Sequence, residues 1–380
     1  MGKIELDHTG SGSGITLSSD GTDLLLDGTA IGGGGGGALE LYAENPSTPT
    51  APSATGTNAV AIGTGSVSSG STSVAIGDRT EATANQTVAI GSLNTRCSSI
   101  QGVAIGSARA SGLLGSVAIG GYGSGYSVAS NNYSISLGRS YSGGDASLAA
   151  AITNNTSTYG ATGANSIAMG YQSKATSGYG VAIGRSCQAG DTGFATGSSA
   201  LATGAKAFSH GLNTTASEAY SIASGREALA NIEGKAARAS GKFAAQGDAQ
   251  SGTFVLRSDT TNAIAEALTT NNSTASTDNQ IILPNNSAYS FSGTIVARES
   301  AASSTDCAAW EVKGLIRREG SAGTTVLVNS ATTVIDNTPS WGMALSADTT
   351  NGGLKIQVTG AASTNIRWVA TIHTSEVTYA

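Results

Sequence analysis

Residues 60–91 read VAIGTGSVSSGSTSVAIGDRTEATANQTVAIG, in which the tetrapeptide Val-Ala-Ile-Gly occurs three times at a spacing of 14 residues. The chain contains six copies of the tetrapeptide Val-Ala-Ile-Gly, ending at Gly63, Gly77, Gly91, Gly106, Gly120 and Gly184. Near copies end at Gly138 and Gly170, and the successive spacings are 14, 14, 15, 14, 18, 32 and 14 residues. A fixed period of this kind is typical of repeat architectures, in which stacked units bury a face that one unit cannot bury alone.

Each unit predicts one coil of a parallel β-roll. In Val60-Ala61-Ile62 the period of two places the branched residues on one face and Ala on the other. Branched residues suit a buried pleated surface, and the following Gly allows the chain to turn with a positive φ. The predicted core residues are Val60, Ile62, Val74, Ile76, Val88, Ile90, Val103, Ile105, Val117, Ile119, Val181 and Ile183.

A looser half-repeat continues the pattern toward residue 250. Its glycines, Gly197, Gly204, Gly211 and Gly225, are 7, 7 and 14 residues apart. This spacing predicts two short strands in each 14-residue unit and about twelve coils in all. An antiparallel sandwich with coincidental spacing is the alternative.

The composition excludes several classes of protein. The chain has 380 residues, 53 Gly, 5 Pro and 12% charged residues, and the glycines follow no strict period of three, which excludes collagen. A hydrophobic fraction of 39% and a net charge of −6 favour an ordered chain. Three scattered Cys fit assembly in a reducing cytosol. Since no apolar leader or spanning stretch is present, we expect neither a secretory signal nor membrane insertion.

Residues 56–250 resemble the head repeats of trimeric autotransporter adhesins of the YadA type. The resemblance rests on the Ser-Val-Ala-Ile-Gly units and the Ala-x-Ala-x-Gly-like segments between them. It implies a left-handed parallel β-roll in which three chains lie side by side. Because a 14-residue coil is narrow, a core shared among three chains is physically reasonable.

Two further regions flank this shaft. Residues 1–55 predict a small N-terminal module, in which Ile15-Thr16-Leu17 and Leu24-Leu25-Leu26 form a hairpin around Asp20-Gly21, followed by a flexible joint at the glycine run 32–37. Residues 251–380 hold all three Trp and several strand-like segments, with a hairpin turn at Asn351-Gly352. This pattern predicts a C-terminal antiparallel β-sandwich.

The C-terminal segments Ala249–Arg257, Asp348–Ile356 and Ile366–Ala370 are similar to C-terminal domains of tailed-phage and prophage fibre proteins. The N-terminal segment from Ile15 to Thr29 also looks phage-like. These resemblances imply a virion fibre with an N-terminal anchor, a β-roll shaft and a globular tip.

Tyrosines concentrate in one part of the shaft. Seven of the 11 Tyr lie between residues 122 and 179, among Ser, Gly and Asn, near an insertion at residues 139–165. Such a composition resembles an adaptable recognition surface, while packing on the rod or between chains is the alternative. The candidate receptor contacts are Tyr122, Tyr126, Tyr133, Tyr141 and Tyr159.

Other chemistry finds little support in the sequence. The shaft has only 8 acidic residues, which form no close sequence cluster, and the three His are isolated, so we expect no enzymatic activity, metal or cofactor. Residues 56–250 carry 11 basic and 8 acidic residues, an excess too diffuse for nucleic-acid binding.

The sequence therefore predicts a homotrimeric tailed-phage fibre for host attachment. It would be located on the virion, in the tail or on the capsid, after assembly in the host cytoplasm. Its N-terminus would bind other virion proteins, and the tip or the Tyr-rich segment would bind a host surface glycan or protein. The alternatives are a structural or decorating fibre, a bacterial trimeric surface adhesin and, with less support, a polysaccharide depolymerase.

Overall fold

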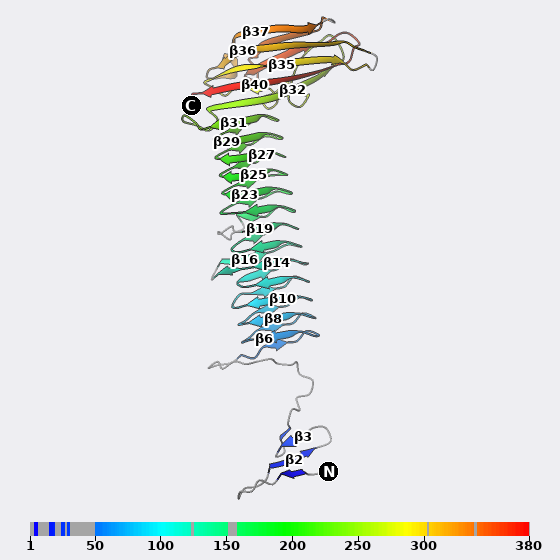
Figure 1. The fold of residues 1–380 in the computed structure, drawn as a ribbon, viewed down its shortest axis with the longest axis vertical. Coiled ribbons are helices and arrows are strands. Elements are labelled where there is room, and N and C mark those ends of the chain that lie inside the picture. The colour runs from blue at the N-terminus through cyan, green and yellow to red at the C-terminus, as the bar shows by residue number, and fades with distance from the viewer. Residues whose placement is uncertain are drawn as a thin grey trace.

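The structure, a computed structural model, describes residues 4–6, 15–19, 24–26, 29–30, 50–122, 125–150, 158–301, 304–337 and 340–379. Within these ranges the chain is all β, apart from one short 3₁₀ helix, η1 (Ala322–Thr324). The repeats stack as successive coils of a rod, and the C-terminal strands lie across its end (Figure 1). The predicted parallel β solenoid is confirmed.

One parallel sheet of the rod, the VAIG sheet, contains every Val-Ala-Ile-Gly segment. Its strands pair in register, with Val88 between Val74 and Val103. The strands are β6 (Val60–Ile62), β8 (Val74–Gly77), β10 (Val88–Gly91), β12 (Val103–Ile105), β14 (Val117–Ile119), β17 (Ile135–Leu137), β19 (Leu148–Ala150), β21 (Ile167–Met169), β23 (Val181–Arg185), β25 (Phe194–Ser198), β27 (Phe208–Leu212), β29 (Ile222–Arg226) and β31 (Ala236–Ser240).

A second parallel sheet, the narrow sheet, supplies the other strand of each coil. It consists of β5 (Ser53–Ala54), β7 (Val67–Ser68), β9 (Glu81–Ala82), β11 (Arg96–Cys97), β13 (Ala108–Ala110), β16 (Gly125–Ala129), β18 (Tyr141–Ser142), β20 (Gly160–Ala161), β22 (Lys174–Ala175), β24 (Gln188–Ala189), β26 (Leu201–Ala202), β28 (Thr215–Ala216) and β30 (Leu229–Ala230), and β15 (Gly121–Tyr122) pairs antiparallel with β16. The described residues thus form thirteen coils, against about twelve predicted. The left-handed winding stays a prediction.

The inside of the coils corrects the predicted core. Ala75, Ala89 and Ala104, between the branched residues, are fully buried, and alanines of the narrow sheet face them. The two sheets lie so close that only small side chains fit between them. The predicted core residues Val60, Ile62, Val74, Ile76, Val88, Ile90, Val103, Ile105, Val117, Ile119, Val181 and Ile183 instead point outward, half-buried or exposed in the single chain.

Buried hydroxyl groups complete the inner face, which explains the Ser and Thr excess. Ser73 Oγ donates to the Gly70 carbonyl at 2.6 Å, and Ser221 Oγ donates to the Glu218 carbonyl at 2.7 Å. Each hydroxyl therefore satisfies a carbonyl three residues earlier in its own coil. A buried polar group with a partner avoids most of the cost of leaving water.

The corners of each coil need backbone conformations in the left-handed region. The predicted role of the tetrapeptide glycine is confirmed, since Gly77 has φ +123° and Gly106 has φ +81°. A second corner lies two residues before each strand of the VAIG sheet and mostly carries other residue types with positive φ. These include Asn58, Thr72, Gln86, Gln101, Tyr133, Ala146, Asn165, Tyr179, Thr192, Lys206 and Tyr220.

We expect Gly77→Ala to destabilise the rod by about 1–3 kcal/mol. A Cβ on Gly77 would lie 1.6 Å from the Gly91 carbonyl oxygen of the next coil, in addition to the unfavourable φ. Gly106→Ala is the matched control, because its Cβ would meet no atom closer than 3.5 Å. Urea unfolding of both variants checks this, and equal losses would contradict the role assigned to coil contact.

The N-terminal strands confirm the predicted hairpin. β2 (Ile15–Ser19) pairs antiparallel with β3 (Leu24–Leu26), and β1 (Ile4–Leu6) and β4 (Thr29–Ala30) complete a four-stranded sheet. The predicted flexible joint at residues 32–37 lies outside the described residues.

The tip begins where parallel pairing ends. β32 (Ala249–Thr260) pairs antiparallel with β31, and β40 (Ile366–Thr378), β35 (Ser287–Glu299), β36 (Cys307–Arg318) and β37 (Val326–Asn337) follow in that order. A smaller sheet consists of β33 (Ala265–Ala267), β34 (Ile281–Ile282), β38 (Gly342–Asp348) and β39 (Gly353–Thr359). The predicted turn at Asn351-Gly352 joins β38 to β39.

Both tip sheets contribute to one hydrophobic core. Trp368 and Trp310 of the large sheet stack with ring centroids 5.7 Å apart, and Trp341, which precedes β38, packs against Trp368 at 5.8 Å. The predicted β-sandwich is therefore confirmed in part: the tip has two antiparallel sheets that share one core. The large sheet is not a separate layer, because β31 and β32 continue it directly into the VAIG sheet.

A buried ion pair joins the last coil to the tip. Lys235 Nζ lies 2.7 Å from Glu376 Oε2, with side-chain exposures of 2% and 0%. Gln250 Nε2 donates to the same oxygen at 2.8 Å, and Thr374 Oγ1 donates to Glu376 Oε1 at 2.7 Å. Both oxygens of the Glu376 carboxylate therefore have partners. The sequence did not predict this contact, because Lys235 and Glu376 are 141 residues apart and Glu376 lies outside the repeat.

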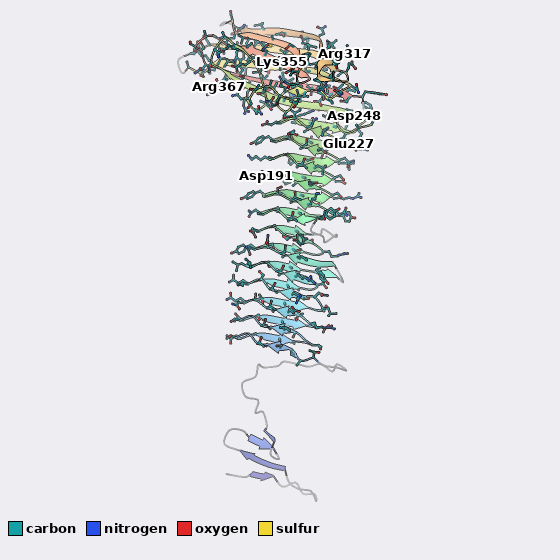
Figure 2. All side chains as sticks on the ribbon, turned by 180° about the vertical axis from the view of Figure 1, so that it is seen from behind. Asp191, Glu227, Asp248, Arg317, Lys355 and Arg367 are labelled. Atoms are coloured by element: carbon teal, nitrogen blue, oxygen red, sulfur yellow. The ribbon has the colours of Figure 1, made fainter. Side chains whose placement is uncertain are left out.

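We expect the stability of the fold to be sensitive to acid because of Asp248, which lies in a loop beside this junction. Asp248 lies where the last coils meet the tip, in the same region as Glu227 (Figure 2). Burial opposes ionisation of Asp248, but the N–H groups of Ala244, Phe243 and Ala245 outweigh it and hold the pKa of this carboxyl below its ordinary value.

Because the folded pKa is the lower one, the ionised Asp248 stabilises the fold above the unfolded pKa of about 3.9. We expect this contribution to disappear as pH falls through the folded pKa. Thermal unfolding between pH 3 and pH 7 should show a smaller pH dependence in Asp248→Asn than in the parent chain. An unchanged slope would contradict the assignment.

Candidate receptor-contact surface

The two outer faces of the rod differ in chemistry. The outer face of the VAIG sheet carries a column of exposed apolar side chains, the apolar stripe. Phe194 and Phe208 stack on this stripe with centroids 5.4 Å apart. The exposed members of the stripe are Val60, Ile90, Ile105, Ile119, Ile135, Leu137, Met169, Ile183, Phe194, Phe208 and Ile222. Such a continuous apolar surface is typical of an interface.

The outer face of the narrow sheet carries charges instead. Glu81, Arg96 and Arg109 occupy the same register position on β9, β11 and β13, and we call them the polar ladder. Arg96 Nε donates to Glu81 Oε2 at 2.7 Å. A groove of about 410 Å³ runs along these rungs, and the hydroxyl-bearing residues Thr83, Ser98 and Ser111 complete its lining.

Arg109 is the cation of the ladder that Glu81 does not neutralise. Its guanidinium carbon lies 4.2 Å from the ring centroid of Tyr126, a cation–π contact. Arg109 Nε is shielded from solvent and has no hydrogen-bond partner among the described residues. Guanidinium groups pair with carboxylates through two parallel hydrogen bonds. The positive charge of Arg109 in the groove lining can therefore attract an acidic group, with hydroxyls beside it as hydrogen-bonding partners.

The structure separates the five predicted Tyr contacts. Tyr126 and Tyr141 lie half-buried on strands of the narrow sheet, and Ser130 Oγ donates to Tyr141 Oη at 3.2 Å. Tyr133 occupies a corner and is 58% exposed, whereas Tyr159 packs against the alanine core. Tyr122 lies on β15, and its side chain is outside the described part. Tyr126 contacts Arg109 of the polar ladder, and Tyr141 lies in the register column of the ladder two coils beyond Arg109. A receptor role for all five stays a prediction.

Sequence reasoning missed the polar ladder. Its residues are 15 and 13 positions apart, so irregular coil lengths conceal their shared register. The ladder could have been found from the residue that precedes the small buried residue of each narrow-sheet strand. In three successive coils this residue is charged: Glu81, Arg96 and Arg109.

Three carboxylates that are distant in sequence come together near the tip. Burial raises the pKa of Glu218, and the nearby charges of Asp278 and Glu233 raise it further. The contact between the last coils and the tip therefore brings these carboxylates near one another, which the sequence did not show. Among the residues that the structure describes, no group of three or more His, Cys, Asp or Glu side chains has a metal-binding arrangement.

Comparison with known proteins supports the shaft fold. Residues 54–80, 68–94 and 161–186 match the YadA head domain repeat. A search of curated proteins gives no match. Among solved structures, the chain is similar to tailspike protein gp49 from Acinetobacter baumannii bacteriophage Fri1, a capsular polysaccharide depolymerase, with 12% identity and a TM-score of 0.24. The match covers 86% of this chain and 48% of the tailspike, so the chain spans about half of that protein.

This comparison corrects one prediction. We expected a protein without enzymatic activity, but the matched solved structure is that of an enzyme. The expectation is therefore withdrawn, while 12% identity does not assign the tailspike's activity to this chain. Separately, the described residues include no helix with the length and apolar character to cross a membrane.

Proposed function

We propose that the chain forms a homotrimeric fibre that attaches a virion to a host cell. The observation that carries this proposal is the apolar stripe, which runs along the outer face of the VAIG sheet. A single chain would leave Phe194, Phe208 and many branched residues in water. Burial of apolar surface contributes about 25 cal/mol per Å², so a long stripe strongly favours association.

We propose that three copies associate through the stripe. The inner face of each coil is already filled by alanine and hydroxyl groups, so the stripe has no partner within the described chain. The match to the YadA head repeat favours three chains around one axis, with the stripes directed inward. The polar ladder lies on the other sheet, so it would remain accessible on the outside of the trimer.

The attachment role rests on this outward surface. The ladder groove offers Arg109 and several hydroxyls to an acidic glycan or an acidic protein on the host. A trimer presents three copies of the groove, and tethered copies raise the effective concentration of a weak site. The N-terminal module would join the fibre to other virion proteins, and the protein would be located in the tail or on the capsid.

Competition with virus adsorption tests this function. Saturating host cells with the purified full-length protein should reduce adsorption of the virus, and gold-labelled antibody should mark fibres on the particle. Arg109→Gln should weaken competition about tenfold or more. Lys174→Gln, on the same outer column of β22, is the matched control. Undiminished adsorption at saturating protein would overturn the attachment role. A parallel assay for new reducing ends shows whether the bound polysaccharide is also cleaved.

A further inference from the structure

A pocket of about 370 Å³ lies where the shaft meets the tip. Two coil corners, Tyr220 and Gly234, form one side together with Glu233. Val255 and Arg257 of β32, with Thr270, form the other side. We call this the junction pocket. It exists only in the folded chain, because its residues come from two coils and from the first part of the tip.

The coil corners explain why the pocket is open. Lys206, Tyr220 and Gly234 occupy the same corner of three consecutive coils, with φ values of +57°, +58° and +71°. Lys206 Nζ lies 5.1 Å from the ring centroid of Tyr220 and donates to its hydroxyl at 3.2 Å. The next corner is Gly234, which has no side chain to lie beside the ring. The Tyr220 side chain is therefore fixed from the preceding coil and remains 55% exposed.

The polar groups of the junction pocket include one without a partner. Thr270 is 8% exposed, and its Oγ1 has no hydrogen-bond partner among the described residues. An unsatisfied buried hydroxyl is unfavourable, and its place in the pocket lining makes it available to a hydroxyl-bearing ligand. Glu233 is fixed by Asn271, whose Nδ2 donates to Glu233 Oε2 at 2.7 Å. The pocket thus combines a fixed carboxylate acceptor with an unused hydroxyl.

We propose that the junction pocket binds one neutral pyranose unit of a glycan. Tyr220 and Val255 offer an apolar surface for the C–H face of the sugar ring. The Glu233 carboxylate accepts hydrogen bonds from sugar hydroxyls, while Arg257 donates and Thr270 does either. The neighbouring carboxylates Glu218 and Asp278 disfavour a uronate or phosphate at this place. The proposal deepens the attachment function by naming a second site and its ligand class.

Saturation-transfer NMR on the full-length protein tests the pocket. The probes are glucose, galactose and N-acetylglucosamine, with glucuronate as the charged comparison. We expect transfer to at least one neutral sugar, and binding about tenfold weaker in Tyr220→Ala. Thr270→Val, which keeps the side-chain shape, should also weaken binding. Tyr179→Ala is the matched control, since Tyr179 occupies the same corner in an earlier coil with φ +59° and 64% exposure.

Three results would overturn the proposal: no transfer to any neutral sugar, equal binding by Tyr220→Ala, or stronger binding of glucuronate. Melting curves of all variants show whether the fold is retained, and Thr270→Val keeps the test valid if Tyr220→Ala unfolds. The competition assay distinguishes a failure of the junction-pocket proposal from a failure of the attachment function. If the sugars fail to bind while the parent protein still blocks adsorption, the attachment function stands and the junction pocket does not serve it.

Discussion

Replacing Lys235 by Met should destabilise the protein by about 3–5 kcal/mol, because it leaves the buried Glu376 carboxylate without its cation. The side chains are 2% and 0% exposed, and their atoms are 2.7 Å apart. Water cannot compensate the lost charge, and the neighbours Gln250 and Thr374 supply only neutral hydrogen bonds. Urea unfolding, followed through the Trp fluorescence of the tip, measures the loss.

Two further variants isolate the ion pair. Lys242→Met breaks the more exposed pair with Glu227, whose atoms are 3.2 Å apart, and should cost no more than about 1 kcal/mol. The double variant Lys235→Met/Glu376→Leu removes both charges and should recover most of the lost stability, since an apolar pair of similar size tolerates burial. A loss for Lys235→Met as small as that for Lys242→Met would contradict the account of this junction.

Placing charges on the apolar stripe should dissociate the proposed trimer. In Phe194→Asp/Phe208→Asp, two stacked rings of each chain become carboxylates. The proposed three-fold symmetry would bring the carboxylates of the three chains close together. Burying an unpaired charge costs several kcal/mol at each site. We therefore expect the mass in solution to fall to the 37.3 kDa of one chain.

The matched control for this prediction is Gln188→Asp/Leu201→Asp. These residues lie on the narrow sheet at the same level of the rod, and both are half-buried. Light scattering after size exclusion should show an unchanged mass for the control. If the control dissociates and the Phe variant does not, the narrow sheet rather than the VAIG sheet forms the interface.

The repeat made the solenoid predictable but left the direction of its side chains ambiguous. A strict alternation such as Val60-Ala61-Ile62 separates two faces without saying which one lies inside. We assigned the branched face to the core because large apolar residues are usually buried. In the structure, the space between the two sheets is so narrow that alanines fill it and the branched residues point outward. This spacing follows from the geometry of the coil rather than from residue type. We propose that the branched side chains are buried at the interface between chains instead of inside one coil.

The candidate sites were less predictable than the fold. Tyr126 was found through composition, but its partner Arg109 depends on register between coils of unequal length. The junction pocket joins Tyr220 to Thr270, 50 residues later, through a strand that reverses direction after the last coil. β37, with exposed Val334 and Ile335 near its end, was not predicted, because its mixture of Asn, Ser and Thr resembles a loop.

The mass of the intact protein in solution shows whether the apolar stripe joins three chains. Native mass spectrometry of the full chain should give three times 37.3 kDa, with no stable species of one chain at micromolar concentration. Association is expected because the apolar stripe has no partner within the described chain, and the proposed number of three rests on the match to the YadA head repeat. A mass of 37.3 kDa, obtained from a folded and soluble protein, would contradict the trimer and with it the proposed burial of the stripe.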